Sequence, residues 1–178
     1  MATLQECPMI RPVVLTIAAI SIATPLQAAR FQFCWIGGGG YTMEGIIEVP
    51  DDLVGTGIIN ETQVTGFRIY GFHNGIPVGS WTLEQLTPQT TWTLSFDTTK
   101  LEFPTGGERL LNRYQAWNAN GAVNDCGVGG FGFNAGNWAQ DVCIDNTYID
   151  VSSIDRYTPL PAFAMDVEMT CNAVQPMS

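Results

Sequence analysis

Aromatic and amide side chains in or beside the segment from about 118 to 143 are the residues whose types and spacing best suit ligand binding. Rings alternate there with glycine and asparagine, so flat apolar faces stand beside amide groups that donate and accept hydrogen bonds. Such a surface suits a glycan or an envelope protein partner. The candidate binding rings are Tyr114, Trp117 and Trp138. The same rings could instead anchor a long loop, because long loops in compact domains need anchors or have a function of their own.

Oxygen-bearing side chains that suit a hard cation cluster in the last third of the chain. They are Asp141, Asp145, Asn146, Asp150 and Asp155. Because Ca²⁺ takes oxygen ligands, this cluster indicates a structural calcium site with Asp145 and Asp150 as its candidate ligands. The spacing is not that of an EF-hand, and solvated loop acids are the alternative.

Nucleophilic catalysis of the Ser-His-Asp type finds little support in the chain. The single histidine, His73, is next to a predicted hairpin turn, and no G-x-S-x-G elbow is present. A G-x-G-x-x-G match at residues 127–132 lacks the strand before it and the helix after it that dinucleotide binding needs.

Glycoside hydrolysis needs two carboxylates about 5 to 9.5 Å apart. Glu44 and Glu48 lie on one face of a predicted strand, but four residues at ~3.3 Å each separate their backbones by about 13 Å. Carboxylates of different strands could still meet. A non-catalytic binding domain is therefore the main prediction, and an exported carbohydrate-active hydrolase with unidentified carboxylates is the alternative.

The cysteines indicate an oxidising compartment. Removal of Cys7 with an N-terminal signal would leave four, which allow three pairings. We predict that Cys126 pairs with Cys143, because they bracket the glycine-rich segment, and Cys34 with Cys171, because they lie near the two mature ends. Zinc is a weaker alternative, since no C-x-x-C pair is present.

An apolar run at 13–23, followed by small residues after Pro25, predicts a signal peptide at residues 1–28. The run of about eleven is too short for the ~20 residues of a bilayer-spanning helix. Cleavage is expected after Ala28 or Ala29, and Met9 is the preferred translation start because Arg11 then gives a basic opening. The mature protein is expected to be secreted or periplasmic, without a membrane span.

The remaining residues, 29–178, are expected to form a single domain. Apolar residues recur mostly at every second position, and turn residues interrupt them every eight to twelve. This pattern predicts an all-β, disulfide-bonded antiparallel sandwich, jelly-roll-like or related. Asn74 and Gly75 predict a hairpin turn. The expected strands are 31–36, 41–49, 64–72, 77–81, 91–97, 142–144, 148–151 and 162–171, with a bridged Gly/Asn-rich loop at about 118–143.

The composition excludes two classes of function. Seven basic against 17 acidic residues give a formal charge of -10 and a pI near 4.2, which leaves no basic surface for nucleic acid. The 11% aromatic content is too high for a disordered chain. Low charge with many Thr, Gly and Asn residues is typical of a secreted β-protein.

The stretch 44–103 resembles domains of exported bacterial proteins of the exosortase-sorted (PEP-CTERM) kind. The resemblance rests on a Gly55-Thr56-Gly57 step, the segment 61–67, the phrase Leu86-Thr87-Pro88 and a strand ending in Phe96-Asp97-Thr98-Thr99. It implies a bacterial envelope or secreted β-domain and no catalytic residues. The ending Pro176-Met177-Ser178 follows no apolar span or basic cluster, so sorting to the membrane by that route is not expected.

Overall fold

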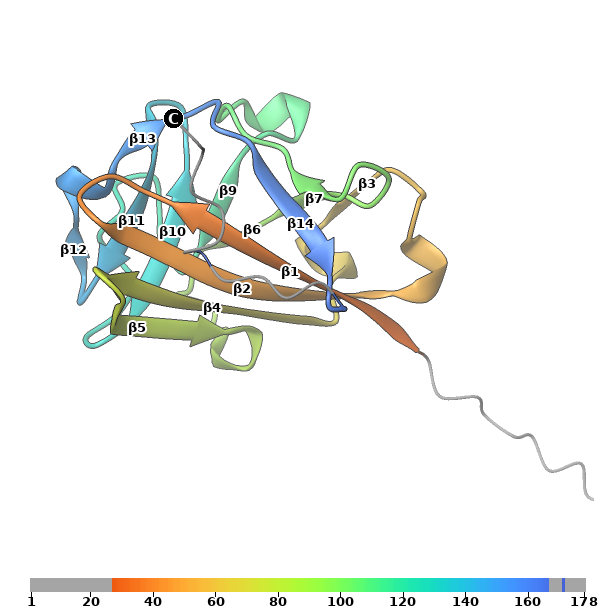
Figure 1. Ribbon diagram of the computed structural model, residues 1–178, viewed down its shortest axis with the longest axis horizontal. Coiled ribbons are helices and arrows are strands. Elements are labelled where there is room, and N and C mark those ends of the chain that lie inside the picture. Colours follow the sequence, from red (N-terminus) through yellow and green to blue (C-terminus); the bar gives the residue numbers. More distant parts are fainter. Residues whose placement is uncertain (1–26, 167–170, 172–178) are drawn as a thin grey trace, which may run out of the picture.

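The computed structural model describes residues 27–166 and Cys171. These residues form two antiparallel sheets packed face to face, joined by turns and short 3-10 helices (Figure 1). The predicted all-β sandwich is therefore confirmed. The described part of the chain excludes residues 1–26 of the predicted signal peptide. It also excludes residues 167–170 of the expected strand 162–171. No helix within the described ranges has the length and hydrophobicity to cross a membrane.

The larger sheet has eight strands in the order β3-β7-β8-β14-β1-β2-β4-β5. Its strands are β1 (Ala28–Ile36), β2 (Tyr41–Pro50), β3 (Ile58–Asn60), β4 (Gly66–His73), β5 (Ile76–Thr82), β7 (Ser95–Asp97), β8 (Glu102–Phe103) and β14 (Leu160–Ala164). The predicted hairpin turn between β4 and β5 is confirmed. Asn74 and Gly75 both have positive φ, 52° and 78°, as a type I′ turn requires.

The smaller sheet has the order β12-β11-β10-β9-β6, and β13 also pairs with β11. Its strands are β6 (Trp92–Thr93), β9 (Gln115–Trp117), β10 (Phe131–Ala135), β11 (Ala139–Ile144), β12 (Thr147–Tyr148) and β13 (Ile154–Asp155). The 3-10 helices are η1 (Asp51–Leu53), η2 (Glu61–Gln63), η3 (Leu83–Gln85), η4 (Arg109–Leu111) and η5 (Asp150–Ser152).

Aromatic rings fill the space between the two sheets. Trp117 of β9 is completely buried, and the ring centroids of Phe33, Phe67, Phe103 and Phe133 lie 4.8–5.5 Å from it. Phenylalanines of the larger sheet thus meet the smaller sheet around one indole. Aromatic pairs at such separations add stabilisation beyond the area they bury.

The expected strand 91–97 is divided between the two sheets. Trp92 pairs with Trp117 in the smaller sheet, whereas Phe96 pairs with Ile59 in the larger one. Between them the Leu94 amide donates to Glu61 Oε2 at 3.3 Å. Both halves keep their apolar side chains in the core, so alternation alone could not show that the chain passes from one sheet to the other.

The expected loop 118–143 was too long. Phe131, Phe133 and Ala135 alternate along β10, a central strand of the smaller sheet, and β11 begins at Ala139. The bridged loop therefore covers 118–130. Likewise the expected strand 148–151 is the two-residue β12 followed by η5, because the turn at Ile149 leads into a 3-10 helix.

Close packing fixes the β4–β5 hairpin against β10. A Cβ atom on Gly71 would lie 2.1 Å from Phe131 Cε2, so only glycine lets the two elements approach this closely. This contact fixes the first residue of β10, and with it one end of the smaller sheet, against the hairpin.

Candidate functional site

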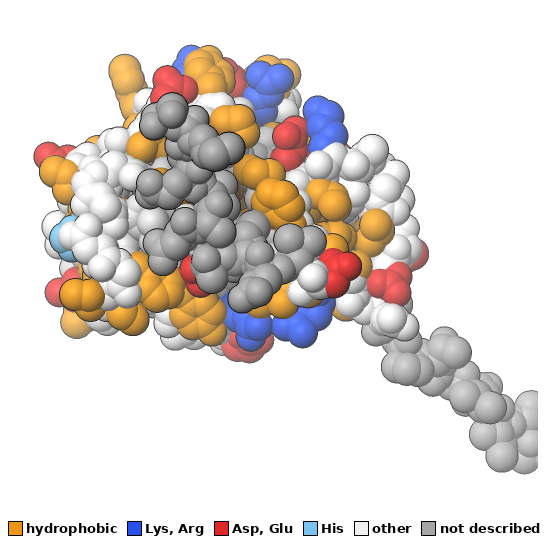
Figure 2. All heavy atoms as spheres, in the orientation of Figure 1, with side chains coloured by type: hydrophobic (Ala, Val, Ile, Leu, Met, Phe, Trp, Pro, Cys, Tyr) orange, Lys and Arg blue, Asp and Glu red, His pale blue; other side chains and the backbone are white. Residues whose placement is uncertain are grey.

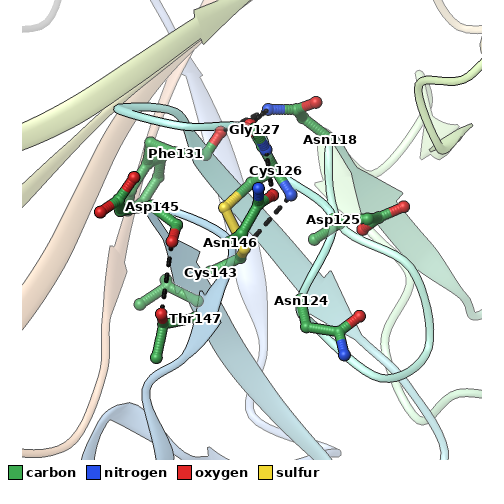
Figure 3. The surroundings of a disulfide bond; sticks show 12 residues. Asn118, Asn124, Asp125, Cys126, Gly127, Phe131, Cys143, Asp145, Asn146 and Thr147 are labelled. Atoms are coloured by element: carbon green, nitrogen blue, oxygen red, sulfur yellow. Dashed lines mark hydrogen bonds between the residues drawn. A yellow bond between two sulfur atoms is a disulfide. The ribbon is translucent and has the colours of Figure 1, made fainter.

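The bridged loop 118–130 folds back over the outer face of the smaller sheet (Figure 3). A disulfide joins Cys126 to Cys143, and the Asn118 amide donates to the carbonyl oxygens of Cys126 and Phe131 at 2.9 and 3.0 Å. A small buried cluster lies beneath the loop and consists of Ala119, Val123, Cys126 and Cys143. The loop is therefore a third, ordered layer of the domain.

The second disulfide joins Cys34 of β1 to Cys171, 137 positions later in the chain. Both predicted pairings are thus confirmed. These cysteines are joined to each other and offer no thiolate to zinc, which removes the alternative interpretation.

The two candidate calcium ligands cap turns. Asp145 Oδ1 accepts the Gly129 amide at 2.8 Å, and Asp150 Oδ1 accepts the Val151 amide at 2.8 Å. Asn146 accepts the Gly127 amide in the same way. No group of three His, Cys, Asp or Glu residues that could hold a metal ion is found among residues 27–166 and Cys171. The predicted calcium site has no support in this arrangement.

The three candidate rings do not form one platform, which corrects the prediction. Trp117 has no exposed surface and Tyr114 only 5%, whereas Trp138 is 94% exposed. Trp117 lies on the inner face of β9, and Trp138 at the tip of the β10–β11 hairpin. Of the three candidate rings, only Trp138 offers a face on which a ligand can stack.

Three segments hold the hairpin tip at one end of the sandwich. We call this region the loop end; it consists of residues 107–111, 136–138 and 156–157. Gly107, at φ 81°, packs so closely on Gly136 that a Cβ atom would lie 2.4 Å from its carbonyl carbon. From the third segment, Arg156 Nη1 donates to the Asn137 carbonyl at 2.8 Å. The backbone that carries Trp138 is thus fixed from two sides.

Two hollows share Trp138 and Arg109 in their walls. The larger, about 560 Å³, also has Glu108, Leu110, Asn137 and Arg156 in its wall, and we call it the arginine hollow. The smaller, about 240 Å³, also has Tyr114, Asn134 and Asp141, and we call it the aspartate hollow. Figure 2 shows basic and hydrophobic side chains beside each other along the upper edge, where Figure 1 places the coil of η4.

Asp141 supplies a strong acceptor in the wall of the aspartate hollow. The residue is 6% exposed, and its Oδ1 has no hydrogen-bond partner among the described residues. Its Oδ2 accepts from Ser153 Oγ at 3.5 Å, which is a weak contact. Burial raises the pKa of this carboxyl to about 6. Oδ1 is itself shielded from solvent, so no hydrogen bond among the described residues offsets the cost of burying it.

Arg109 is held by stacking on an aromatic ring. Its guanidinium carbon lies 3.6 Å from the Tyr114 ring centroid, and Asn134 Nδ2 fixes the Tyr114 hydroxyl at 3.1 Å. No carboxylate of the described residues comes within 4 Å of the guanidinium nitrogens to form an ion pair. The edges of the guanidinium are therefore available to a ligand.

Comparison with protein-family models, with curated proteins and with solved structures finds no match for this chain. The site therefore has to be interpreted from its own geometry. Sequence reasoning found Trp138 but not Arg109 or Arg156, which are 47 positions apart and meet only in the fold. The chain has only seven basic residues in 178. This scarcity was the one signal in the sequence that an arginine could mark a binding site.

Proposed function

We propose that this protein is a non-catalytic bacterial envelope or extracellular domain that binds a saccharide at the loop end. The observation that carries the proposal is Trp138: a large ring, 94% exposed, stands on a backbone fixed from two sides and between two hollows. Exposed aromatic surface beside convergent polar groups is the usual composition of a small-molecule binding site.

The chemistry around Trp138 suits a sugar. The apolar C–H face of a pyranose can stack on the indole, as apolar groups do on aromatic faces. Hydroxyl groups on the ring edge would then meet the Arg109 guanidinium, which lies in the walls of both hollows. Hollows on both sides of the ring leave room for the neighbouring residues of an oligosaccharide.

Three features support export. The two disulfides are of the kind that persists in oxidising compartments. The apolar run 13–23 has the length of a signal-peptide core. The resemblance of 44–103 to exosortase-sorted proteins supports an envelope or secreted location.

A protein partner is the second candidate, and Leu110 favours it. Its side chain is 99% exposed in the wall of the arginine hollow, next to Trp138 and Arg109. Tryptophan and arginine are enriched among the residues that dominate protein interfaces. A partner would bury Leu110, whereas a sugar stacked on Trp138 has no need of it.

A glycan array followed by calorimetry tests the saccharide proposal. The purified protein should retain at least one oligosaccharide, and Trp138→Ala should weaken that binding at least about tenfold, since a lost aromatic contact is worth on the order of 1.4 kcal/mol or more. Tyr70→Ala removes a half-exposed ring from β4 and is the matched control, with unchanged affinity.

Three outcomes would count against the proposal. A parent protein that retains no glycan, or equal affinities for both variants, contradicts saccharide binding at Trp138. Binding of a protein that Leu110→Ser abolishes would favour the second candidate. Release of shorter saccharides, lost in Asp141→Asn, would favour the hydrolase.

A further inference from the structure

The arginine hollow is a region of local positive charge on an acidic protein. The chain has a formal charge of -10, yet this hollow has two arginines, Arg109 and Arg156, and one carboxylate, Glu108, in its wall. Glu108 Oε1 is already an acceptor for the Tyr157 hydroxyl at 3.4 Å. The hollow therefore carries a positive excess that the described residues do not neutralise.

Arg109 is pre-organised for a planar anion. One face of its guanidinium lies on Tyr114, which leaves the N–H edges pointing away from that ring. A guanidinium edge presents parallel N–H donors that match the two oxygens of a carboxylate. Because stacking already restricts the side chain, less conformational entropy is lost when an anion binds.

Arg156 contributes positive charge to the arginine hollow while it keeps its contacts to Asn137 and Tyr157. Its Nη1 holds the Asn137 carbonyl at 2.8 Å, its Nη2 contacts the Tyr157 hydroxyl, and its guanidinium carbon lies 4.5 Å from the Tyr157 ring centroid. These contacts are to neutral groups, so the positive charge of Arg156 remains uncompensated beside the hollow. It would attract an anion that Arg109 binds directly.

We propose, building on the saccharide-binding function above, that the ligand is an acidic saccharide of the uronic-acid class. Its carboxylate binds Arg109 in the arginine hollow, and its ring stacks on Trp138. The same or the next ring extends into the aspartate hollow, which also adjoins Trp138. The arginine hollow thus recognises a charge, and the aspartate hollow takes a neutral part of the sugar.

The two carboxylates in the walls of the hollows limit the ligand to about one charge per ring. Glu108 lies in the wall of the arginine hollow and Asp141 in that of the aspartate hollow. A densely charged polyanion would bring like charges against both carboxylates, and like-charge contacts oppose binding. One carboxylate on each ring, with the other groups of the ring neutral, limits that conflict.

Calorimetry with a charged probe and its uncharged analogue tests this inference. The probes are hexagalacturonate and its methyl ester, which has the same rings without the charge. The parent protein should bind hexagalacturonate about 10- to 100-fold more tightly than the ester, as expected for a charge-assisted hydrogen-bond pair. Arg109→Gln should remove most of that difference. Arg109→Lys, which keeps the charge but not the planar edge, should recover only part of it.

Arg113→Gln is the matched control. It removes the same charge from an exposed position four residues away, outside both hollows. Its preference for the charged probe should stay within about threefold of the parent value, since long-range attraction between exposed charges is screened by salt.

Each remaining outcome separates the two proposals. Equal affinities of the parent for both probes would overturn the acidic-ligand inference and leave saccharide binding intact. A preference that Arg109→Gln and Arg113→Gln reduce equally would show diffuse attraction and also overturn it. If neither probe binds while a neutral glycan does, the inference fails alone; if no saccharide binds at all, the proposed function fails with it.

Discussion

Two tryptophans 21 positions apart occupy opposite environments in this domain. Trp117 has no exposed surface and is surrounded by phenylalanine rings of both sheets, whereas Trp138 is 94% exposed at a hairpin tip. The first ring has neighbours on every side. The second has none above it, although its backbone is fixed by Gly107 and Arg156.

The difference separates residues that stabilise the fold from residues that are available to a ligand. The rings of the aromatic core pack closely on one another, although the buried Trp117 Nε1 has no hydrogen-bond partner among the described residues. A change there is expected to cost stability. The loop end combines a rigid backbone with an uncovered ring and an unpaired guanidinium. A change there is expected to cost binding and little stability.

The largest effect is expected from Trp117→Ala. Truncation leaves a cavity among Phe33, Phe67 and Phe133, and we expect the free energy of unfolding to fall by about 3–5 kcal/mol. Urea denaturation measures it. Trp138→Ala in the same experiment should change the free energy by no more than about 0.5 kcal/mol. Similar losses in both variants would remove the contrast between the two regions.

Removal of the Cys126–Cys143 disulfide should give the next largest effect. The disulfide closes a loop of 17 positions, and a double Cys→Ser variant should lose about 3 kcal/mol in the chain-entropy model. Val123 of the bridged loop forms part of the aspartate hollow, so binding of neutral sugar rings should weaken too. Unchanged melting of the double variant would contradict an ordered third layer.

Gly107→Ala tests how the tip is held. The new Cβ would overlap the Gly136 carbonyl, and the positive φ of 81° is unfavourable for alanine. We expect a loss of about 1–3 kcal/mol together with weaker ligand binding, because the hairpin tip must move. Gly55→Ala is a suitable comparison: its φ is also positive, at 78°, but open space surrounds the new Cβ. Full retention of affinity in Gly107→Ala would argue against a pre-organised tip.

Asp141→Asn should produce the smallest change in stability, and one that depends on pH. Burial raises the folded pKa to about 6 from an ordinary 3.8, so between these values the folded state holds a proton that the unfolded state lacks. The contribution of Asp141 to stability therefore falls as the pH rises from 4 to 6. The variant should match the parent at pH 4 and be more stable at pH 7.5 by about 1 kcal/mol, below the limit of ~3 kcal/mol that the shift allows.

Thermal melts across pH 4 to 7.5 would show whether the stabilities of variant and parent diverge in this way. Asp155→Asn, at an exposed position on β13, is the control and should leave the slope unchanged. A variant that is less stable than the parent at pH 7.5 would show that the charged Asp141 carboxylate stabilises the fold, and would contradict the cost assigned to its unpaired oxygen.

The fold was more predictable from the sequence than the site. Alternation along Phe31, Phe33 and Trp35 marks β1, and Asn74-Gly75 marks a turn, because both signals are local. Glycine and asparagine around Phe131 and Phe133 concealed β10, whose alternation covers only five residues. No feature of the neighbouring sequence distinguishes the buried Trp117 from the exposed Trp138.

The binding residues depend on contacts that are distant in sequence. Arg109, Asp141 and Arg156 come from η4, β11 and the loop after β13, and only the folded sheets bring them to one end. The clustered aspartates suggested calcium because carboxylates suit it. In the structure Asp145 Oδ1 and Asp150 Oδ1 each accept a backbone amide of a turn, which a list of residue types does not reveal.

The most direct test of the central claim uses the indole N–H signals of the five tryptophans in a ¹H–¹⁵N spectrum. The protein would be titrated with hexagalacturonate and with a neutral oligosaccharide that the array retains, after assignment by single Trp→Phe variants. We expect a saturable shift of the Trp138 signal with at least one probe, while the buried Trp117 and Trp35 signals stay in place. A Trp138 signal that both probes leave unmoved, or a bound sugar that shifts only other tryptophans, would contradict saccharide binding at the loop end.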